Sequence, residues 1–305
     1  TEIIVRAGGK LSIDGLLNIN STGISIVEDG GEVIFAQNSD LQVSSVDSRM
    51  LIKGKLTLGP NARLNFSGDG RLVFDQSPWV NGQLDLGSYY DFDPSSEVKL
   101  VGTSAIPKIV EVKKPLYLKD GQQNSPQRVE LNNLDIRLHS GAFIYLFSNF
   151  LVNSCDFQEA IPQQSPGHGG LRVFANPGSI NNIQNSHFGP GQNAIRAHWL
   201  GNVAPLRIMD NTFTATGLQL ESGRFDILRN DFTGSTLRGI SLQGYSNFSH
   251  NTFQQSPLIL DASNQTSVDV EGNEFLGTLN AGDGLYLTQI NADLRCNNFE
   301  SLHHG

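Results

Sequence analysis

Short runs of alternating polar and apolar residues recur at a nearly regular interval in the second half of the chain. Each run ends in an apolar residue, and these residues are Leu134, Phe157, Phe188, Phe213, Phe232, Phe253, Phe275 and Phe299. The intervals range from 19 residues (213 to 232) to 31 residues (157 to 188). A period of about 22 residues with insertions of variable length is typical of a solenoid, in which each repeat forms one coil.

Each repeat contains two such alternating runs. Another apolar residue stands five positions before the terminal one in every repeat, and the residues between are mostly polar. A second run follows the phenylalanine and occupies 170–174, 194–198, 217–221, 239–243 and 284–288. Period-two alternation predicts strands with one buried face. Since a coil of this length has no room for a helix, the pattern predicts an all-β fold, the parallel β-helix.

Asparagine usually stands two positions before the phenylalanine, and three positions before it in the Phe188 repeat. The residues concerned are Asn211, Asn230, Asn251, Asn273 and Asn297. Asparagine tolerates the left-handed backbone that a sharp corner between strands requires. We therefore expect these residues to form the corners and a hydrogen-bonded ladder along the stack, with the phenylalanines stacked in the core.

The first half follows a different rhythm, in which glycine precedes an alternating strand. The stretches are 9–13, 31–35, 54–58, 70–74 and 82–86. We expect coils of this type over 1–125, with an irregular transition at 88–125, and coils with Asn-x-Phe corners over 126–305, all in one continuous β-helix. No amphipathic cap helix is evident, so we expect a longer polypeptide or another chain to cover the ends.

The composition of the chain argues against some classes of partner and against a membrane-spanning helix. The 305 residues carry a net charge of −9, which argues against nucleic acid and anionic membrane surfaces as partners. No apolar stretch approaches the ~20 residues of a membrane-spanning helix. We take the chain as a processed product or an internal fragment. Cys155 and Cys296 are six coils apart, too far to pair with each other, and both are expected to be core thiols.

The Asn-x-Phe repeats resemble the right-handed parallel β-helix coils of the pectin-lyase-like superfamily, over residues 126–300. The opening residues 2–15, EIIVRAGGKLSIDG, resemble the N-terminal coils of large secreted bacterial surface proteins, especially those exported by the type IX pathway. The resemblances imply an extracellular or cell-surface protein, often an adhesin or a structural rod. Many members of the wider superfamily cleave acidic polysaccharides.

The residues give little support to a polysaccharide hydrolase or lyase. Gly167-His168-Gly169 resembles a polygalacturonase motif, and Arg207-Ile208-Met209 matches another in part. The pair of carboxyl groups that glycoside hydrolysis requires is missing upstream of His168. A lyase would need an arginine or lysine base and a cation. No catalytic residue is assigned; Arg196, His198 and Glu221 are the weak candidates for an atypical lyase or hydrolase site.

Four carboxylates form the densest acidic group: Asp269, Glu271, Glu274 and Asp293. Asp269 and Asp293 take the same outward position in adjacent coils, which would suit Ca²⁺. The alternative is a solvated acidic face. We assign no metal site and no cofactor, since the histidines His139, His187 and His250 also lack the spacing of metal ligands.

The outward face of the second strand is the best candidate for a binding surface. One outward row is expected to contain Arg172, Arg196, Gln219, Ser241, Ile259 and Tyr286. The other contains Phe174, His198, Glu221, Gln243, Asp261 and Thr288, with Trp199 beside His198. Such side chains could bind a polysaccharide or surface glycan by ring stacking and polar contacts; the alternative is an ordinary solvent face.

The sequence thus predicts an extracellular or cell-surface β-helix with a structural or adhesive role, and glycan binding as its molecular activity. The alternatives are the polysaccharide enzyme and a scaffold that assembles end to end through uncapped coils.

Overall fold

The computed structural model describes residues 2–20, 22–102, 107–122, 124–147, 149–160, 169–174, 181–191, 193–198, 204–261, 266–277 and 284–300. These residues form strands and turns, with no helix among them; none of the described segments could therefore cross a membrane as a helix. The chain divides into two compact units. The first unit contains 1–150 and 158–168, and the second contains 151–157 and 169–305. Each is a parallel β-solenoid, as the sequence predicts.

Three strands per coil build the first unit. One sheet contains β1 (Ile4–Val5), β4 (Ile24–Val27), β7 (Arg49–Ile52), β10 (Arg71–Phe74), β15 (Lys108–Val112) and β18 (Leu134–Leu138). The second contains β2 (Lys10–Ile13), β5 (Glu32–Phe35), β8 (Lys55–Leu58) and β13 (Tyr90–Phe92). The third contains β3 (Leu16–Ile19), β6 (Asp40–Val43), β9 (Arg63–Ser67), β14 (Glu97–Val101) and β17 (Arg128–Asn132). Strands β16 (Leu116–Tyr117) and β19 (Ile144–Leu146) pair with each other in parallel.

The second unit also has three sheets, which we name by their place relative to the phenylalanines. The preceding sheet contains β20 (Asn149–Asn153), β23 (Asn182–Gln184), β26 (Leu206–Met209), β29 (Phe225–Leu228), β32 (Ser246–Ser249), β35 (Ser267–Glu271) and β38 (Asn291–Arg295). The phenylalanine sheet contains β21 (Asp156–Glu159), β24 (His187–Phe188), β27 (Thr212–Thr214), β30 (Asp231–Thr233), β33 (Thr252–Gln254), β36 (Glu274–Leu276) and β39 (Asn298–Glu300). The following sheet contains β22 (Gly169–Phe174), β25 (Asn193–His198), β28 (Gly217–Glu221), β31 (Thr236–Ile240), β34 (Leu258–Asp261) and β37 (Leu285–Thr288).

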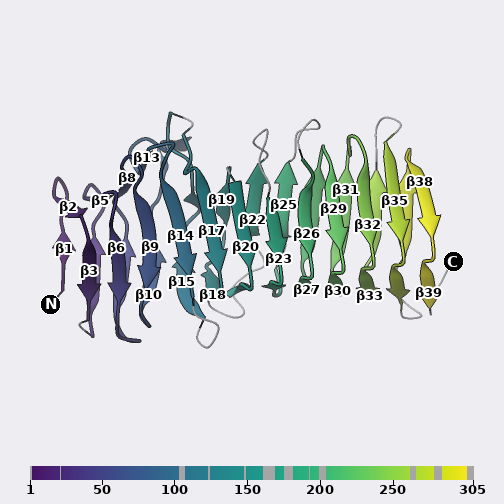
Figure 1. Cartoon of the computed structure of the whole chain (residues 1–305), viewed down its shortest axis with the longest axis horizontal. Coiled ribbons are helices and arrows are strands. Elements are labelled where there is room, and N and C mark those ends of the chain that lie inside the picture. The colour runs from purple at the N-terminus through teal and green to yellow at the C-terminus, as the bar shows by residue number, and fades with distance from the viewer. Residues whose placement is uncertain are drawn as a thin grey trace. The chain divides into compact units, whose positions relative to one another are not determined.

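Paired strands within each of these sheets are parallel and in register from coil to coil. Figure 1 shows β26, β29, β32, β35 and β38 side by side in the green and yellow part of the chain. Alternate residues are buried along most strands, as in β28 and β35. The period-two pattern in the sequence therefore corresponds to a buried and an outward row in each sheet.

The phenylalanines form a continuous stack in the second unit. Ring centroids lie 4.6 Å apart for Phe157 and Phe188 and 4.7 Å apart for Phe213 and Phe232, with planes within 9° and 5° of parallel. The stack continues to Phe299, whose ring is 4.8 Å from that of Phe275. The predicted core position of the phenylalanines is confirmed, although Phe299 is 46% exposed in the last described coil.

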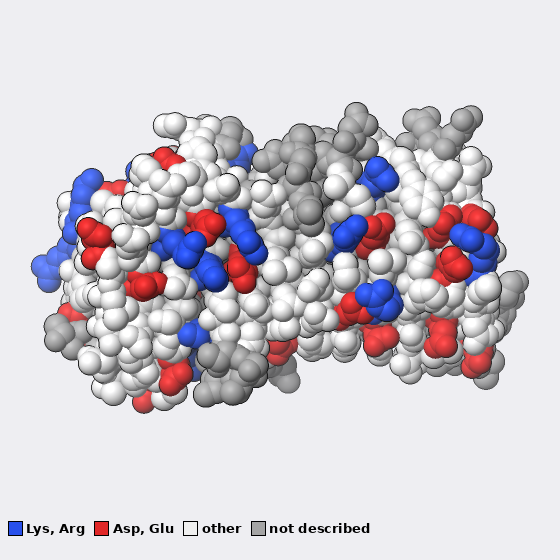
Figure 2. All heavy atoms as spheres, in the orientation of Figure 1, with Lys and Arg blue, Asp and Glu red and all other residues white. Residues whose placement is uncertain are grey.

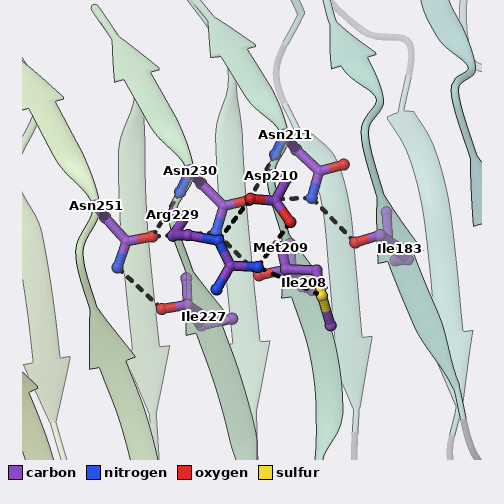
Figure 3. A network of polar contacts seen from close by, with 9 residues as sticks. All are labelled: Ile183, Ile208, Met209, Asp210, Asn211, Ile227, Arg229, Asn230 and Asn251. Carbon is purple, nitrogen blue, oxygen red and sulfur yellow. Dashed lines mark hydrogen bonds and ion pairs between the residues drawn. The ribbon is translucent and has the colours of Figure 1, made fainter.

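An asparagine ladder runs beside this stack (Figure 3). The Asn230 Oδ1 accepts hydrogen bonds from the Asn211 backbone N–H and Nδ2, both at 3.0 Å. The Asn230 Nδ2 in turn donates to the Ile208 carbonyl at 2.9 Å and to the Asn251 Oδ1 at 3.0 Å. The same pattern continues through Asn273 to Asn297. The predicted ladder is confirmed.

The expected backbone conformation of the asparagines is wrong, because the left-handed residue is the one before each asparagine. Positive φ angles occur at Asp210 (56°), Arg229 (53°), His250 (57°), Gly272 (63°) and Cys296 (54°). In the Phe188 repeat Asn185 takes this conformation, and Ser186 occupies the ladder position, where its N–H donates to the Asn211 Oδ1 at 3.0 Å. The ladder side chain thus needs an ordinary backbone, and its neighbour makes the corner.

Glycine corners in the first unit arise from close packing of successive coils. A Cβ atom on Gly54 would lie 2.2 Å from the Gly31 carbonyl oxygen and 2.5 Å from that of Glu28. Only glycine fits such an approach. The predicted division into two coil types near residue 125 stays a prediction.

One predicted coil strand, 82–86, is wrong. Residues 79–84 form an antiparallel hairpin, in which β11 (Trp79–Val80) pairs with β12 (Gln83–Leu84). The turn residues Asn81 and Gly82 have φ angles of 51° and 77°, as in a type I′ turn. The hairpin lies within a long coil. In the sheet that contains β1, β4, β10 and β15, the paired residues Val73 and Glu111 are 38 positions apart, whereas the paired residues Ile4 and Ile26 are 22 positions apart.

The two cysteines differ in burial. Both are free; Cys155 is buried, whereas Cys296 is exposed. The Cys155 thiol donates to the Asn153 carbonyl at 3.3 Å. The expectation of a core thiol therefore fails for Cys296, which occupies the left-handed corner position and not a core position.

Candidate functional site

The following sheet places the predicted binding residues in two outward rows. Arg172, Arg196 and Gln219 are register partners on β22, β25 and β28, and so are Phe174, His198 and Glu221. On β34 and β37, Ile259 pairs with Tyr286 and Asp261 with Thr288. The structure therefore brings together most of the residues that the sequence predicts for this face.

The prediction is wrong in the fourth coil, where the outward residues are Arg238 and Ile240. Arg238 pairs with Gln219 and Ile240 with Glu221. Ser241 has a left-handed φ of 50° after the end of β31, and Gln243 lies beyond it. This register could have been predicted from the number of residues between each phenylalanine and the first inward residue of the following strand. Leu218, Leu237 and Leu258 each follow the phenylalanine of their repeat by five positions.

Glu221 is the centre of a polar cluster that joins adjacent coils. Its Oε1 accepts hydrogen bonds from the Arg196 guanidinium, at 3.0 Å from Nε and 2.7 Å from the terminal nitrogen. The Gln219 Nε2 donates to the same oxygen at 2.6 Å. The Glu221 side chain is 22% exposed and that of Arg196 is 46% exposed. The cluster therefore holds a carboxylate in a fixed position at the surface.

An apolar surface lies next to the cluster. The rings of Phe174 and His198 have centroids 6.1 Å apart and are tilted by 49°. The His198 Nδ1 is 3.7 Å from the Glu221 Oε2, beyond hydrogen-bond distance. An oriented carboxylate, two amide or guanidinium donors and a pair of rings are the groups that orient and pack against a sugar. Trp199, the remaining predicted residue of this face, lies outside the described residues.

The polygalacturonase-like residues do not assemble a second site in the described structure. Gly167 and His168 lie outside the described residues. Arg207 belongs to the preceding sheet, where its Nε is 3.4 Å from the Asp226 Oδ2. Met209 lies on the same strand, with its sulfur 4.0 Å from the Arg229 guanidinium.

The acidic group of the last coils is organised by an arginine that the sequence analysis missed. The Arg295 guanidinium lies 3.2 Å from Asp269, 3.4 Å from Glu271 and 3.3 Å from Asp293. Asp269 and Asp293 are register partners, as predicted, whereas Glu274 lies on the phenylalanine sheet. Among the described residues no three His, Cys, Asp or Glu side chains are placed to hold a metal ion. Neither the absence of a cofactor nor the alternative of Ca²⁺ binding is tested by this arrangement, and both stay predictions.

Two histidines form hydrogen bonds with carboxylates that spacing alone did not reveal. In the first unit the His139 Nε2 lies 2.7 Å from the Glu111 Oε1, one coil away. In the second unit the His187 Nδ1 lies 2.7 Å from the Asp156 Oδ1. The available signal for His139 was its alternation with Asp135 and Arg137: these two lie outward on β18, and His139 follows directly after the strand, beside Glu111.

Aromatic side chains gather on β16 and β19 of the first unit. The rings of Tyr117 and Tyr145 are stacked with centroids 4.6 Å apart, and Phe143 meets Tyr145 edge-on at 4.9 Å. The Lys119 ammonium lies 4.6 Å above the Phe147 ring. Tyr117 is buried, the other three rings are half-buried, and the rings pack against one another. They are therefore a packed cluster rather than a row like that of the following sheet.

The charged side chains of both units are mostly interspersed. On the face in Figure 2, lysines and arginines lie beside aspartates and glutamates. This agrees with the short ion pairs within each unit, such as Arg229–Asp210 at 2.7 Å and Arg63–Glu97 at 2.8 Å. The face in Figure 2 therefore does not favour binding by a broad field of one charge.

Comparison with known proteins adds little to this description. No protein-family model matches the chain, and no curated protein matches it significantly. Two crystal structures of the periplasmic alginate epimerase AlgG, one of them a point mutant, are similar at TM-scores of 0.26 and 0.22. Their identities are 11% and 10%, over 95% of this chain and 87% of theirs. Similarity at this level supports no inference about function.

Proposed function

We propose that the protein is an extracellular or cell-surface β-helix with a structural or adhesive role, which binds glycans through the following sheet of its second unit. The observation that carries the proposal is the Glu221 cluster. Arg196 and Gln219 fix the carboxylate, and the Phe174–His198 ring pair lies on the neighbouring strands. A sugar needs polar groups for its hydroxyls and a ring surface for its C–H face. Both are present here, and the polar groups are already held in place, so binding does not have to pay for ordering them.

Binding and turnover are tested together on a panel of acidic and neutral polysaccharides, with and without Ca²⁺. Affinity electrophoresis measures retention, and assays for new reducing ends and unsaturated products measure cleavage. We expect retention without turnover. Turnover on any polymer would contradict the binding role and establish the enzyme alternative.

The residues are tested with a matched pair of arginine variants. Arg196→Ala removes the guanidinium that fixes Glu221, and we expect at least a tenfold loss of affinity. Arg207→Ala is the control, because Arg207 is similarly exposed and ion-paired but lies on the preceding sheet; its affinity should change less than twofold. Equal effects of the two variants would argue against this site.

The cellular location is tested separately, by antibody labelling and protease treatment of intact cells that produce the protein. The resemblance of residues 2–15 to secreted surface proteins supports an exposed location. Labelling only after lysis would contradict it.

A further inference from the structure

We propose that the Glu221 cluster selects neutral sugars, and that it discriminates against ligands that carry carboxylates. This inference rests on the proposed glycan-binding function and specifies the chemical class of the ligand at the same site. The sugar donates a hydroxyl hydrogen to Glu221 and packs a C–H face against Phe174 and His198.

The Arg196 guanidinium is already paired with the Glu221 carboxylate. Both the Nε and a terminal nitrogen of Arg196 donate to Glu221 Oε1, so the two charges offset each other. A sugar carboxylate placed at Arg196 would have to displace Glu221 or lie beside the carboxylate of Glu221. Because Glu221 is only 22% exposed, solvent and salt screen such repulsion less than they would at a fully exposed position.

The unused acceptor positions of the Glu221 carboxylate favour a ligand that donates a hydrogen bond. Glu221 Oε1 accepts three N–H groups, whereas Oε2 accepts no hydrogen bond from the described residues; the His198 Nδ1 lies 3.7 Å from it. An ionised carboxylate accepts only and has about four acceptor positions. A sugar hydroxyl is a suitable donor, and a ligand carboxylate has no hydrogen to offer.

The ring pair supplies the second contact. Phe174 and His198 belong to adjacent strands in register, next to Glu221 on the third strand. The two half-buried rings have centroids 6.1 Å apart and planes tilted by 49°. A pyranose buries its C–H face against such aromatic surfaces without needing a charge.

The test compares polymers that differ only in charge. A uronic-acid polysaccharide is measured against its carboxyl-reduced form, alongside neutral glucan, mannan and galactan, at about 0.15 M salt. We expect a neutral polymer to bind, and the carboxylated form to bind at least tenfold more weakly than its reduced counterpart. If the carboxylated form binds equally or better, the inference fails while the proposed function stands. If no polymer binds, both fail.

A variant sharpens the result. Glu221→Gln removes the negative charge and leaves Arg196 without its partner, so affinity for the neutral polymer should fall at least tenfold while affinity for the carboxylated polymer rises. A purely structural role for Glu221 would lower both. Asp226→Asn is the matched control, because Asp226 is 21% exposed and pairs with Arg207 on the preceding sheet; neither affinity should change. The wild-type comparison decides the question by itself if Glu221→Gln does not fold.

Discussion

The two units stack their coils with different side chains. In the first unit, the buried residues of β2 to β9 are mainly aliphatic, and charged groups link the coils on the outside, such as Lys10–Glu32 at 2.8 Å and Lys55–Asp91 at 2.8 Å. The second unit has outward ion pairs too, but it adds links inside: the phenylalanine stack and the ladder through Asn211, Asn230 and Asn251. A serine ladder adds to them, with Ser235 and Ser256 buried.

The difference shows two ways to fix register between coils. Aliphatic cores pack with little directional preference, so outward charge pairs and tight glycine corners help to select the register in the first unit. Buried amides are directional and costly to leave unbonded, so a slip by one residue in the second unit would break the ladder along its whole length. We expect interior substitutions to disturb the second unit most.

Phe232→Ala should have the largest effect. The substitution leaves a cavity in a fully buried site, at a typical cost of 3–5 kcal/mol. It also removes two ring contacts, at 4.7 Å and 4.9 Å, each worth roughly 1 kcal/mol. Phe35→Ala in the first unit is the comparison, because Phe35 is equally buried. Hydrogen exchange measured by mass spectrometry reports each unit separately; equal losses would remove the distinction between them.

Asn230→Ala should come next, with a loss of about 2–4 kcal/mol. Truncation removes four buried hydrogen bonds: those from the backbone N–H and Nδ2 of Asn211, and those to the Ile208 carbonyl and the Asn251 Oδ1. The Asn211 Nδ2 keeps its bond to the Ile183 carbonyl, and the Asn251 Oδ1 keeps that from the Asn230 backbone N–H. The same exchange measurement should show lost protection in the coils on both sides. The exposed Asn291 serves as the control, and Asn291→Ala should change stability by less than about 0.5 kcal/mol.

Gln76→Met should stabilise the first unit. Gln76 is 2% exposed, and neither polar atom of its side chain has a hydrogen-bond partner in the described structure. A buried amide without partners costs roughly 1–3 kcal/mol, and methionine has a similar shape. Denaturant unfolding should show a gain of about 1 kcal/mol. A loss instead would indicate that the amide binds buried water.

Glu32→Gln should have the smallest effect, and one that depends on pH. Burial by itself would raise the pKa of Glu32, but hydrogen bonds from Lys10 and Thr57 and the nearby lysine charges lower the pKa overall. A lowered folded-state pKa means that the carboxylate stabilises the fold above the unfolded pKa of about 4.3. That contribution, about 0.5 kcal/mol, is lost as pH falls through the folded pKa. Wild type and variant should therefore differ at pH 7 and converge in acid; a constant difference would argue against the titration of Glu32.

Most of the fold follows from the sequence because each coil repeats the same buried positions. Phe213 and Ile208, five residues apart, are both fully buried. The failures occur where local chemistry departs from the repeat. Asn81-Gly82 is a strong type I′ turn signal, yet the stretch 82–86 also matches the alternating strand pattern. Only the antiparallel pairing of Trp79 with Leu84 decides between them.

The candidate site was predictable in composition but not in register or bonding. Arg172, Arg196 and Gln219 lie in one row because their strands are in register. Arg238 was missed because Gly239 resembles the glycine that begins other strands, although it is an inward residue of β31. The bonds of Arg196 and Gln219 to Glu221 depend on rotamers, which no spacing rule encodes.

The spacing of the rings in the phenylalanine stack does not depend on the number of residues between them. Phe157 and Phe188 are 31 residues apart and Phe213 and Phe232 only 19, yet their rings are separated by 4.6 Å and 4.7 Å. The number of residues between the strands therefore does not alter the rise of the coil. Insertions and deletions between strands would leave the stack and the ladder intact, and such positions are suited to grafting foreign peptides on a surface of fixed pitch.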